Sequence, residues 1–491
     1  MQALSPRAAG TTVATLVRAG LLRPARPDHA AGMALALAYW GISPAGGYAL
    51  HAVRDARRAA VVDPGGTLTY ADVDRLTNAA ARALLDRGVG AGQPVGVACG
   101  NTRAFVLAVV ALGKVGATAV LLNPGLSAPL LAGIERDEHL VAVLDDAAVA
   151  DLAGHPDTTR PRPPAERGRY VLLTSGTTGR PKGAARSAPT SLDPLVALLG
   201  TIPLKAGETT VVASPLFHAW GFAQWLVSVA LGSTVVLTGP FDAERTLAAL
   251  EEHRATALVA VPVMLRRLLA VERSYDTSSL RVVAASGSAL PPDVAAAFMD
   301  RFGDVVYDLY GSTEVAWATI ATPADLRAAP GTVGRPAFGT EVVLVDERNG
   351  TGRIFVGNGL VIDAYTSGES KETRGGLMAT GDLGRFDDEG RLYVVGREDD
   401  MIVSGGENVF PAPVEEVLSA LPGVRDAAVV GVPDEEFGQR LRAYVVADGV
   451  TEQDVKDAVR ERLARHYVPR DVVFVVALPR NAAGKVVKRD L

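Results

Sequence analysis

Short apolar runs alternate with longer amphipathic stretches in the first part of the chain. The stretches Ala71–Arg87 and Phe105–Val115 carry apolar residues at helical spacing and predict helices. Three short apolar runs around them predict buried strands: Val95–Ala98, Thr118–Leu122 and Val141–Leu144. This alternation is typical of a parallel sheet with helices on its faces, and it predicts an α/β fold.

The same alternation resumes after an exposed connector that is rich in proline and arginine, Thr158–Arg169. The second series of predicted strands is Thr209–Ala213, Thr234–Leu237, Ala257–Val261 and Arg281–Ala285. Beyond Gly331 the pattern changes to short strands separated by turns, such as Glu341–Val345 and Arg353–Val356. A smaller, β-rich subdomain is therefore expected after the two α/β series.

A further break comes at Gly396-Arg397-Glu398-Asp399-Asp400, and the rest of the chain predicts a compact α+β unit. Its expected helices are Ala412–Ala420 and Glu452–His466, and its expected strands are Ala427–Gly431, Leu441–Val446 and Val472–Val476. The pattern predicts two domains: residues 1–398, with αβ-layered subdomains and the β-rich subdomain, and residues 399–491, a small α+β domain.

Composition narrows the function classes. The chain has 491 residues, 48% hydrophobic residues and a net charge of −6, so no basic footprint for nucleic acid is present. The single cysteine, Cys99, fits a reducing compartment, and the pattern of a signal peptide is missing from the first residues, so a cytoplasmic protein is expected. The apolar stretch Ala30–Ile42 is too short to span a membrane; it predicts a helix that docks on a partner or a membrane surface, or packs on its own domain. Composition does not distinguish a monomer from a dimer.

The run from Leu172 to Gly183 is the most informative local pattern. Two apolar residues lead into hydroxyl residues and glycines, closed by a lysine: Thr174, Ser175, Gly176, Thr177, Thr178, Gly179 and Lys182. Such a loop offers backbone N–H groups, hydroxyl donors and one ammonium group to a polyphosphate. It does not fit the Walker A spacing. The alternative is a glycine-rich surface turn.

Further runs carry candidate chemistry. His218 lies in an aromatic cluster with Phe217, Trp220 and Phe222, where its imidazole is either a functional group or simply packs. Tyr310-Gly311-Ser312-Thr313-Glu314 ends in a carboxylate suited to Mg²⁺, and Asp382, in Thr380-Gly381-Asp382, is suited to a ribose diol. Ser404-Gly405-Gly406-Glu407-Asn408 reads as a close-approach loop or a turn, and Gly484-Lys485 as a functional lysine or a solvated charge.

In this order and at these spacings, the runs resemble those of the adenylate-forming superfamily of acyl-CoA synthetases, adenylation domains and luciferases. The resemblance extends from about Leu50 to Leu491 and is strongest to bacterial fatty-acyl-CoA synthetases. His218 stands where amino-acid adenylation domains carry an aspartate that pairs with the substrate amine, so an amino acid is a poor candidate substrate.

The resemblance implies a two-step reaction that uses ATP, Mg²⁺ and coenzyme A. A carboxylate attacks the α-phosphorus of ATP and pyrophosphate leaves; the CoA thiol then attacks the acyl-adenylate and AMP leaves. It implies that the 174–182 loop holds pyrophosphate, Glu314 holds Mg²⁺ and Lys485 bridges the carboxylate and the α-phosphate. The implied nucleotide-binding residues are Gly287, Ser288, Ala289, Asp308, Leu309, Tyr310, Gly311, Ser312 and Thr313, with Asp382 and Arg397 on the ribose.

The resemblance also implies that the C-terminal domain rotates between the two steps about a hinge at Asp399. Rotation would withdraw Lys485 and bring Ser404, Gly405, Gly406 and Glu407 to the thioester site. The implied acyl pocket contains His218, Trp220, Gly221, Phe222, Val261, Met264, Val315 and Trp317. These side chains are mainly apolar, so an apolar carboxylic acid is expected, whether fatty, aryl or polycyclic.

Two residues depart from the pattern of the family, and two alternatives to the leading function stay open. Tyr467 stands where relatives often carry a lysine, and Ala483 where they often carry threonine. The leading hypothesis is an acyl-CoA ligase. The first alternative is an acyl-AMP ligase that loads a carrier protein, although the insertion usual in such ligases is not evident. The second is a family member that retains only one half-reaction or only binds its ligand.

Overall fold

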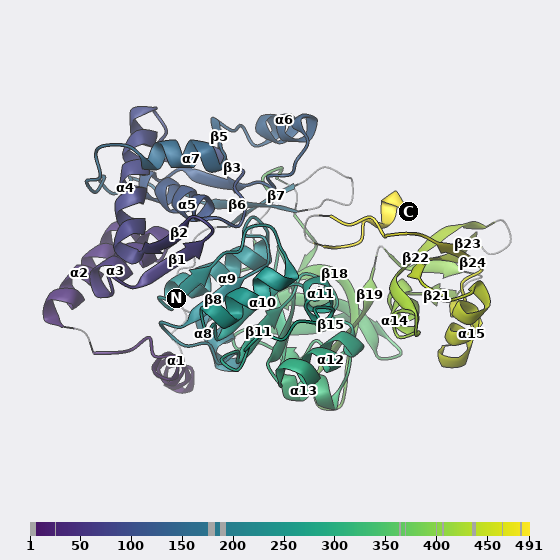
Figure 1. Ribbon diagram of the computed structural model, residues 1–491. Helices are drawn as coiled ribbons and strands as arrows, with labels where there is room; N and C mark the ends of the chain where they lie inside the picture. Colours follow the sequence, from purple (N-terminus) through teal and green to yellow (C-terminus); the bar gives the residue numbers. More distant parts are fainter. Residues whose placement is uncertain are drawn as a thin grey trace.

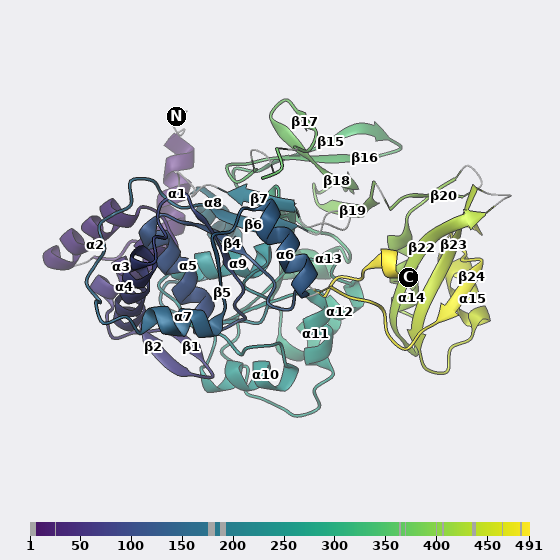
Figure 2. The same cartoon turned by 90° about the horizontal axis from the view of Figure 1, so that it is seen from above.

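The computed structural model describes most of the chain. The described residues are 6–24, 26–174, 182–186, 193–362, 365–368, 370–398, 400–404, 407–434, 438–463, 465–481 and 484–491. Within these ranges the strands form four sheets. Figures 1 and 2 show two large α/β layers, a β-rich part beside them and a small domain set to one side. The expected fold class is confirmed.

The largest sheet is built from the second predicted series. It has nine strands in the order β14-β13-β12-β11-β10-β8-β9-β1-β2. Strands β8, β9, β10, β11 and β12 run parallel to one another. Antiparallel strands lie at both edges of the sheet. The bounds are β1 Ala59–Asp63, β2 Gly66–Thr69, β8 Thr209–Val212, β9 Thr234–Val236, β10 Ala257–Ala260, β11 Val282–Ala285, β12 Val306–Ser312, β13 Ala316–Ala321 and β14 Arg335–Pro336.

The first predicted series forms a five-stranded sheet in the order β5-β3-β4-β6-β7, parallel except for β7. Its strands are β3 Pro94–Val97, β4 Thr118–Leu121, β5 Ala142–Leu144, β6 Tyr170–Thr174 and β7 Lys182–Arg186. Four helices accompany it: α4 Tyr70–Asp86, α5 Arg103–Val115, α6 Ala128–Asp137 and α7 Asp146–Ala153. Thr69 and Asp72 form a capping box that starts α4, and Gly116 ends α5 in the left-handed region.

The helices of the nine-stranded sheet are α8 Asp193–Thr201, α9 Ala219–Ala230, α10 Ala243–Glu252, α11 Pro262–Leu269, α12 Pro292–Phe302 and α13 Pro323–Ala328. Helix α9 is apolar around most of its circumference, as expected for a helix buried on several sides. Phe222 and Trp225 of α9 pack on Phe105 of α5, while α9 also contacts β8, β9 and β10. One hydrophobic core therefore joins the two α/β layers through α9.

The β-rich subdomain expected beyond Gly331 is present as an antiparallel sheet of five strands. The strands are β15 Glu341–Arg348, β16 Thr351–Gly357, β17 Thr373–Arg374, β18 Leu377–Phe386 and β19 Leu392–Arg397. Alternate side chains of β16, including Ile354 and Val356, are buried with Val315 and Leu392. This sheet therefore packs against the turn that follows β12.

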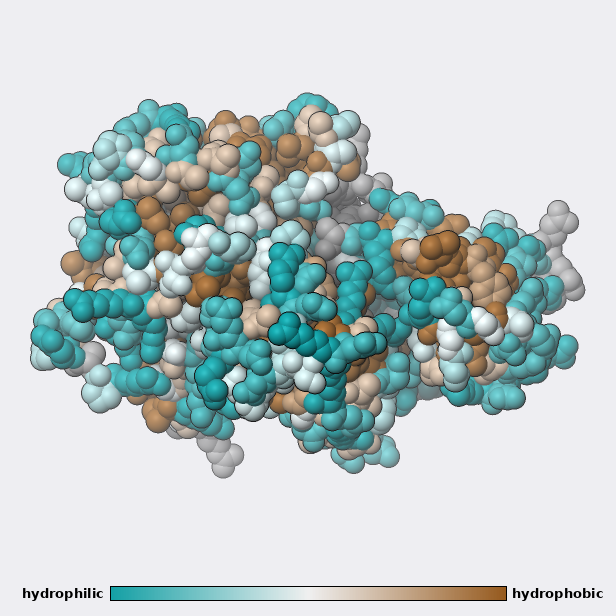
Figure 3. All heavy atoms as spheres, viewed as in Figure 1, coloured by the Kyte–Doolittle hydropathy of each residue, from teal (hydrophilic) through white to brown (hydrophobic). Residues whose placement is uncertain are grey.

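The small domain contains a fourth sheet with two helices. Its elements are β20 Ile402–Ser404, β21 Glu407–Val409, α14 Pro411–Ser419, β22 Val424–Asp434, β23 Gly438–Ala447, α15 Glu452–Arg462, the 3₁₀ turns η1 Arg465–Tyr467 and η2 Lys488–Asp490, and β24 Asp471–Phe474. On the face seen in Figure 3, a hydrophobic patch lies over this domain at the right. Residues of β22, β24 and the chain end that are only partly buried include Val430, Val473, Val475, Val486 and Leu491.

The prediction of one helix over Glu452–His466 is wrong at its end. Helix α15 ends at Arg462, and Leu463 already has extended backbone angles. The turn lets Val468 pack on the domain core together with Leu463 and Tyr467, whereas a continuous helix would turn Val468 away from the face that carries Leu463 and Tyr467.

Three helices precede the first sheet: α1 Pro6–Arg18, α2 Pro27–Trp40 and α3 Pro44–Arg54. The predicted apolar helix at Ala30–Ile42 corresponds to α2, which ends at Trp40 and has Gly41 as its C-cap residue. Ala36 and Trp40 are buried, and α2 packs along α3, while Leu35 and Leu37 remain exposed. The helix therefore packs on its own domain along one side. Among the described helices, none combines the length and apolarity needed to cross a bilayer.

Candidate functional site

A carboxylate, a guanidinium and a phenol meet where β18 and β19 pair. Asp382 and Arg397 are cross-strand partners, and Arg397 Nη1 lies 3.4 Å from Asp382 Oδ1. The Tyr310 hydroxyl, from β12, donates to Asp382 Oδ2 at 2.6 Å. Burial raises the pKa of Asp382, and the Tyr310 hydroxyl and the charges of Arg397, Lys371 and Lys485 oppose that rise. The two residues predicted for the ribose are thus brought together across the carboxyl end of β12.

Glu314 lies in the turn between β12 and β13 and is 7% exposed. The Tyr365 hydroxyl donates to Glu314 Oε1 at 2.5 Å, and Lys371 Nζ lies 3.6 Å from the same oxygen. Burial alone would raise the pKa of Glu314, but the Lys371 ammonium and the Tyr365 and Ser312 hydroxyls outweigh it and hold the pKa below its ordinary value. Glu314 is therefore a carboxylate at neutral pH.

The described residues around Glu314 could hold Mg²⁺ only together with ligands from outside the protein. No group of three or more potential metal ligands gathers among the described residues, so the protein offers no complete cage. Mg²⁺ is commonly held by one or two carboxylates together with substrate phosphates and water. One ionised carboxylate beside a phosphate site matches that pattern.

An unsatisfied carboxyl group lies at the carboxyl end of the nine-stranded sheet. Asp308 is 4% exposed, and its Oδ1 has no hydrogen-bond partner among the described residues. Burial raises the pKa of Asp308 to about 7. Asp308 pairs with Ala285, and the segment that follows, Gly287-Ser288-Ala289, begins with φ +93° at Gly287. The predicted adenine residues, including Leu309 in β12, therefore come from adjacent parallel strands.

His218 is the N-cap residue of α9, and its ring lies 4.5 Å from that of Phe217. Its Nε2 has no partner among the described residues, and burial lowers its pKa to about 4, so the imidazole is neutral at pH 7. A Cβ at Gly221 would stand 2.2 Å from the Pro215 carbonyl oxygen, so glycine is needed for this close approach. The Trp220 indole donates to the Ala260 carbonyl at 3.0 Å.

The predicted acyl-pocket residues divide into two groups. Trp220 and Trp317 are partly buried, whereas Val261 and Met264, at the start of α11, are buried in the core around that helix. Phe222 instead packs with Tyr170 and Trp225 in the core, and Val315 is fully buried in the β-rich cluster. Among these six side chains, Trp220 and Trp317 are therefore the more accessible ones, and the other four lie within hydrophobic cores.

The C-terminal loop that carries Lys485 lies against the large domain. A Cβ at Gly484, where φ is +78°, would stand 2.7 Å from Val263 Cγ1 and 3.9 Å from Val261 Cγ2. Asn481 stabilises the loop, because its Oδ1 accepts from Lys485 N at 2.9 Å. The charge of Lys485 also contributes to the pKa of Asp382. Figures 1 and 2 show this yellow segment reaching from the small domain back over the large one.

Several predicted residues fall partly or wholly outside the described ranges. Thr174 ends β6 and pairs with Lys182, which begins β7, so the strands flank the predicted phosphate loop; Ser175, Gly176, Thr177, Thr178 and Gly179 lie outside the described residues. Ser404 pairs with Glu407 in the β20–β21 hairpin, whereas Asp399, Gly405 and Gly406 lie outside them. Gly311 and Ser312 pair with β13, and Thr313 follows in the turn before Glu314.

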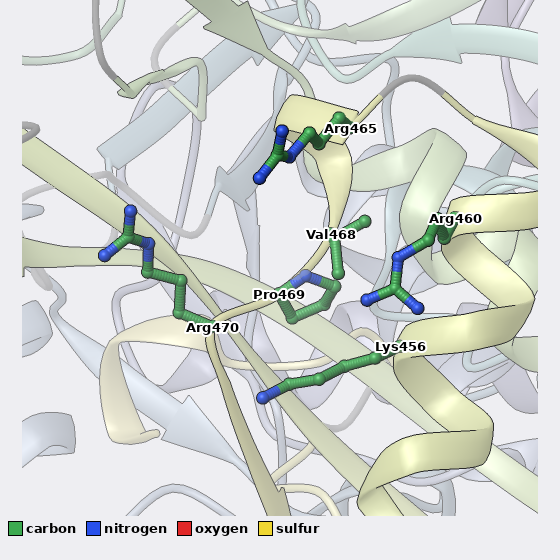
Figure 4. Close-up of a pocket in the computed structure, with 6 residues that line it drawn as sticks. All are labelled: Lys456, Arg460, Arg465, Val468, Pro469 and Arg470. Carbon is green, nitrogen blue, oxygen red and sulfur yellow. The ribbon is translucent and has the colours of Figure 1, made fainter.

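The small domain also has a cationic cavity that sequence reasoning missed. It has a volume of about 790 Å³, and its lining is basic or apolar; Lys456 and Arg460 each also pair with an acidic residue of α15, Glu452 and Asp457. Its lining residues are Lys456, Arg460, Arg465, Val468, Pro469 and Arg470, with four cationic side chains directed around one hollow (Figure 4). The element η1, which carries Arg465, contacts β21 of the predicted close-approach loop. The basic residues from 456 to 470 were a signal, but their convergence requires the turn after α15.

Sequence reasoning also missed Lys371 and Tyr365. Neither residue belongs to a pattern that indicates chemistry, and both reach Glu314 through tertiary contacts about fifty residues along the chain. No local signal would have found them.

Comparisons with known proteins identify the family of this chain. The family model described as "AMP-binding enzyme" matches residues 49–162 and 138–366, and "AMP-binding enzyme C-terminal domain" matches residues 413–485. The chain is 34% identical to a feruloyl-CoA synthase of an Amycolatopsis species, over 91% of this chain and 98% of the relative. It is 29% identical to the long-chain-fatty-acid–CoA ligase FadD13 of Mycobacterium tuberculosis, over 89% and 95%.

Among solved structures, o-succinylbenzoate CoA synthetase (MenE) from Bacillus subtilis, in complex with the acyl-adenylate intermediate OSB-AMP, superposes with a TM-score of 0.81. It is 29% identical, and the match covers 90% of this chain and 97% of that one.

Proposed function

Because the chain belongs to the AMP-binding enzyme family, as an acyl-CoA ligase, we propose that it converts an apolar carboxylic acid into its CoA thioester through an acyl-adenylate. The aryl acids are the first class to test. Partly buried Trp220 and Trp317 offer flat apolar surfaces, and the relatives named above include ligases of feruloyl and succinylbenzoyl substrates. Fatty acids are the second class, because FadD13 acts on long chains.

The observation that carries this proposal is the docking of the Gly484-Lys485 loop on the start of α11. The contact with Val263 brings the lysine to the part of the large domain that also holds Asp382. A second contact between the domains, from Arg266 Nη1 to the Arg425 carbonyl at 2.7 Å, supports the same arrangement. An ammonium group beside a ribose site is well placed for the first half-reaction.

In that half-reaction, a carboxylate oxygen of the acid forms a bond to the α-phosphorus of ATP, and the bond to the pyrophosphate oxygen breaks. Phosphoryl and adenylyl transfer depend mainly on positioning and charge stabilisation. Asp382 and Arg397 would orient the ribose, and Lys485 would hold the acid against the α-phosphate. Mg²⁺, held by Glu314 and the phosphates, would neutralise charge on the leaving pyrophosphate. Neutral His218 would add no charge to the apolar acyl site.

In the second half-reaction, the thiol forms a bond to the acyl carbon and AMP leaves. We propose that the small domain rotates at Asp399, so that the β20–β21 loop replaces Lys485. The cationic cavity lies beside β21 and would move with it. Four cations around one hollow suit the phosphates of CoA, which favours CoA over a carrier protein as the acceptor.

We expect Arg465→Glu to raise the KM for CoA about tenfold, because it reverses one charge in the cavity. Exchange of pyrophosphate into ATP should stay within about twofold of wild type, since that step does not use CoA. The matched control is Arg489→Glu, which reverses an exposed arginine of the same domain outside the cavity. If the KM for CoA is unchanged in Arg465→Glu, the cavity does not take part in binding CoA.

We expect Asp308→Ala to weaken ATP binding by about 10- to 100-fold, the usual effect of removing a buried hydrogen-bond partner of a ligand. The 6-amino group of adenine is a donor that would satisfy Asp308, whereas inosine carries an acceptor there. At a pH above the pKa of Asp308, where its carboxylate can only accept, calorimetric affinities for ATP and ITP should therefore differ in the wild type and converge in the variant. Equal losses of affinity for ATP and ITP in the variant would show that the nucleotide base does not bind at Asp308.

The experiment that tests the function measures acid-dependent exchange of labelled pyrophosphate into ATP across aryl, fatty and polycyclic acids, beside formation of acyl-CoA. Exchange with an apolar acid followed by acyl-CoA supports the proposal. Exchange without acyl-CoA, but with loading of a carrier protein, would identify an acyl-AMP ligase. If no acid supports exchange while a supplied adenylate still yields acyl-CoA, the protein retains only the second step.

A further inference from the structure

The segment from Tyr365 to Lys371 connects the phosphate-loop strand to the candidate metal carboxylate. Tyr365 forms a β-bridge with Ala184, two residues after Lys182. Thr366 N donates to the Gly183 carbonyl at 2.7 Å, and the Thr366 hydroxyl donates to Glu138 at 2.7 Å. The start of this segment is therefore fixed beside β7.

The other end of the segment brings a cation to Glu314. Lys371 Nζ donates to the Thr380 carbonyl at 2.9 Å and lies 3.6 Å from Glu314 Oε1. The Glu314 side chain is 10% exposed and that of Lys371 is 23% exposed. A carboxylate so far removed from water needs a compensating charge, and Lys371 supplies it here.

A divalent cation bound at Glu314 would compete with this ammonium. Both are cations that seek the same carboxylate, and at separations of a few ångströms they repel each other strongly in a site with little water. Lys371 can move away without losing every partner, because the Thr380 carbonyl accepts from it and Asp382 lies close enough for its charge to be felt.

We propose that Lys371 is the counter-ion that Mg²⁺ must displace from Glu314, so that it sets the Mg²⁺ concentration needed for ATP binding. The inference rests on the proposed function. It makes Lys371 a positioning residue that acts through Glu314. Its role differs from that of a phosphate ligand, whose loss would weaken nucleotide binding without shifting the Mg²⁺ requirement.

The test measures binding of α,β-methylene-ATP, which cannot be cleaved between the α- and β-phosphorus, by calorimetry at a series of MgCl₂ concentrations without acid or CoA. We expect Lys371→Gln to lower the half-saturating Mg²⁺ concentration by about three- to tenfold, the effect of removing a half-buried competing ion pair. Lys371→Arg keeps the charge and should stay within about twofold of wild type. Lys488→Gln, which removes a lysine paired with Glu415 in the small domain, controls for net charge.

An unchanged or higher Mg²⁺ requirement in Lys371→Gln would overturn the proposal. So would an analogue affinity that falls by the same factor at every Mg²⁺ concentration, because that result identifies a phosphate ligand. If Lys371→Gln is poorly folded by its thermal transition, Lys371→Met provides the same loss of charge. In a Glu314→Gln background, Lys371→Gln should leave the Mg²⁺ dependence unaltered. A wild-type protein that does not bind the analogue would reject the proposed function itself, and this inference with it.

Discussion

Replacing Lys485 with alanine should lower acid-dependent exchange of pyrophosphate into ATP by about 10²- to 10³-fold, the usual effect of losing a group that stabilises transition-state charge. Conversion of a supplied acyl-adenylate to the thioester should remain near the wild-type rate, because the proposed rotation withdraws Lys485 from that step. The two rates are measured separately, with labelled pyrophosphate and with purified adenylate. The loop around Lys485 is held by the backbone and by Asn481, so the variant should fold normally.

The matched control is Lys488→Ala, three residues further along the same segment. Lys488 pairs with Glu415 at 2.9 Å within the small domain and should leave both rates within about twofold of wild type. Equal losses of both half-reactions in Lys485→Ala would contradict the idea that this lysine serves one domain arrangement only.

The second large effect is expected at Asp382. Replacing it with alanine should raise the KM for ATP by about 100-fold and slow both half-reactions, because the ribose must be held while the domain moves. The change also removes the carboxylate that Tyr310 and Arg397 contact, which should cost about 1–3 kcal/mol of folding stability. Initial rates over a range of ATP concentrations and a denaturant titration separate the two effects.

Asp382→Asn should recover much of the stability, since an amide oxygen accepts a hydrogen bond from Tyr310, but little of the ATP affinity. Asp387→Asn is the matched control on the turn after β18, where Asp387 pairs with Arg391 away from the site. Loss of thermal stability without a change in the KM for ATP would show that Asp382 is structural, and would remove the ribose from this position.

The sequence was most informative where local pattern and burial coincide. The runs Val95–Ala98 and Ala257–Val261 became buried strands within one residue of their expected ends, because both faces of a parallel strand are covered. The sequence was less informative at the end of α15, where the chain turns so that Val468 packs on the domain core. Phe222 and Val315 show a further limit: the spacing of apolar residues does not reveal whether a side chain lines a pocket or the core behind it.

For the candidate site too, the sequence was informative where the residues belong to local runs. Asp382, Arg397 and Glu314 belong to runs whose order and spacing carried a resemblance, and the structure brings the first two together. Lys371 contacts Glu314 only because the chain folds back through the β-rich sheet, and such a contact leaves no trace in local spacing. The four cations of the small domain meet because the chain turns after Arg462.

Helix α9 sets a limit on how this protein can change its substrate. His218 caps the helix at the proposed acyl site, and Phe222 and Trp225, one and two turns further on, hold the two α/β layers together. Enlarging the pocket by trimming Phe222 would open a cavity in that shared core, at about 3–5 kcal/mol for a phenylalanine-to-alanine change. Trp317, in β13, is only partly buried and does not join the two layers. Natural drift or laboratory evolution toward bulkier acids should therefore begin at Trp317 and spare α9.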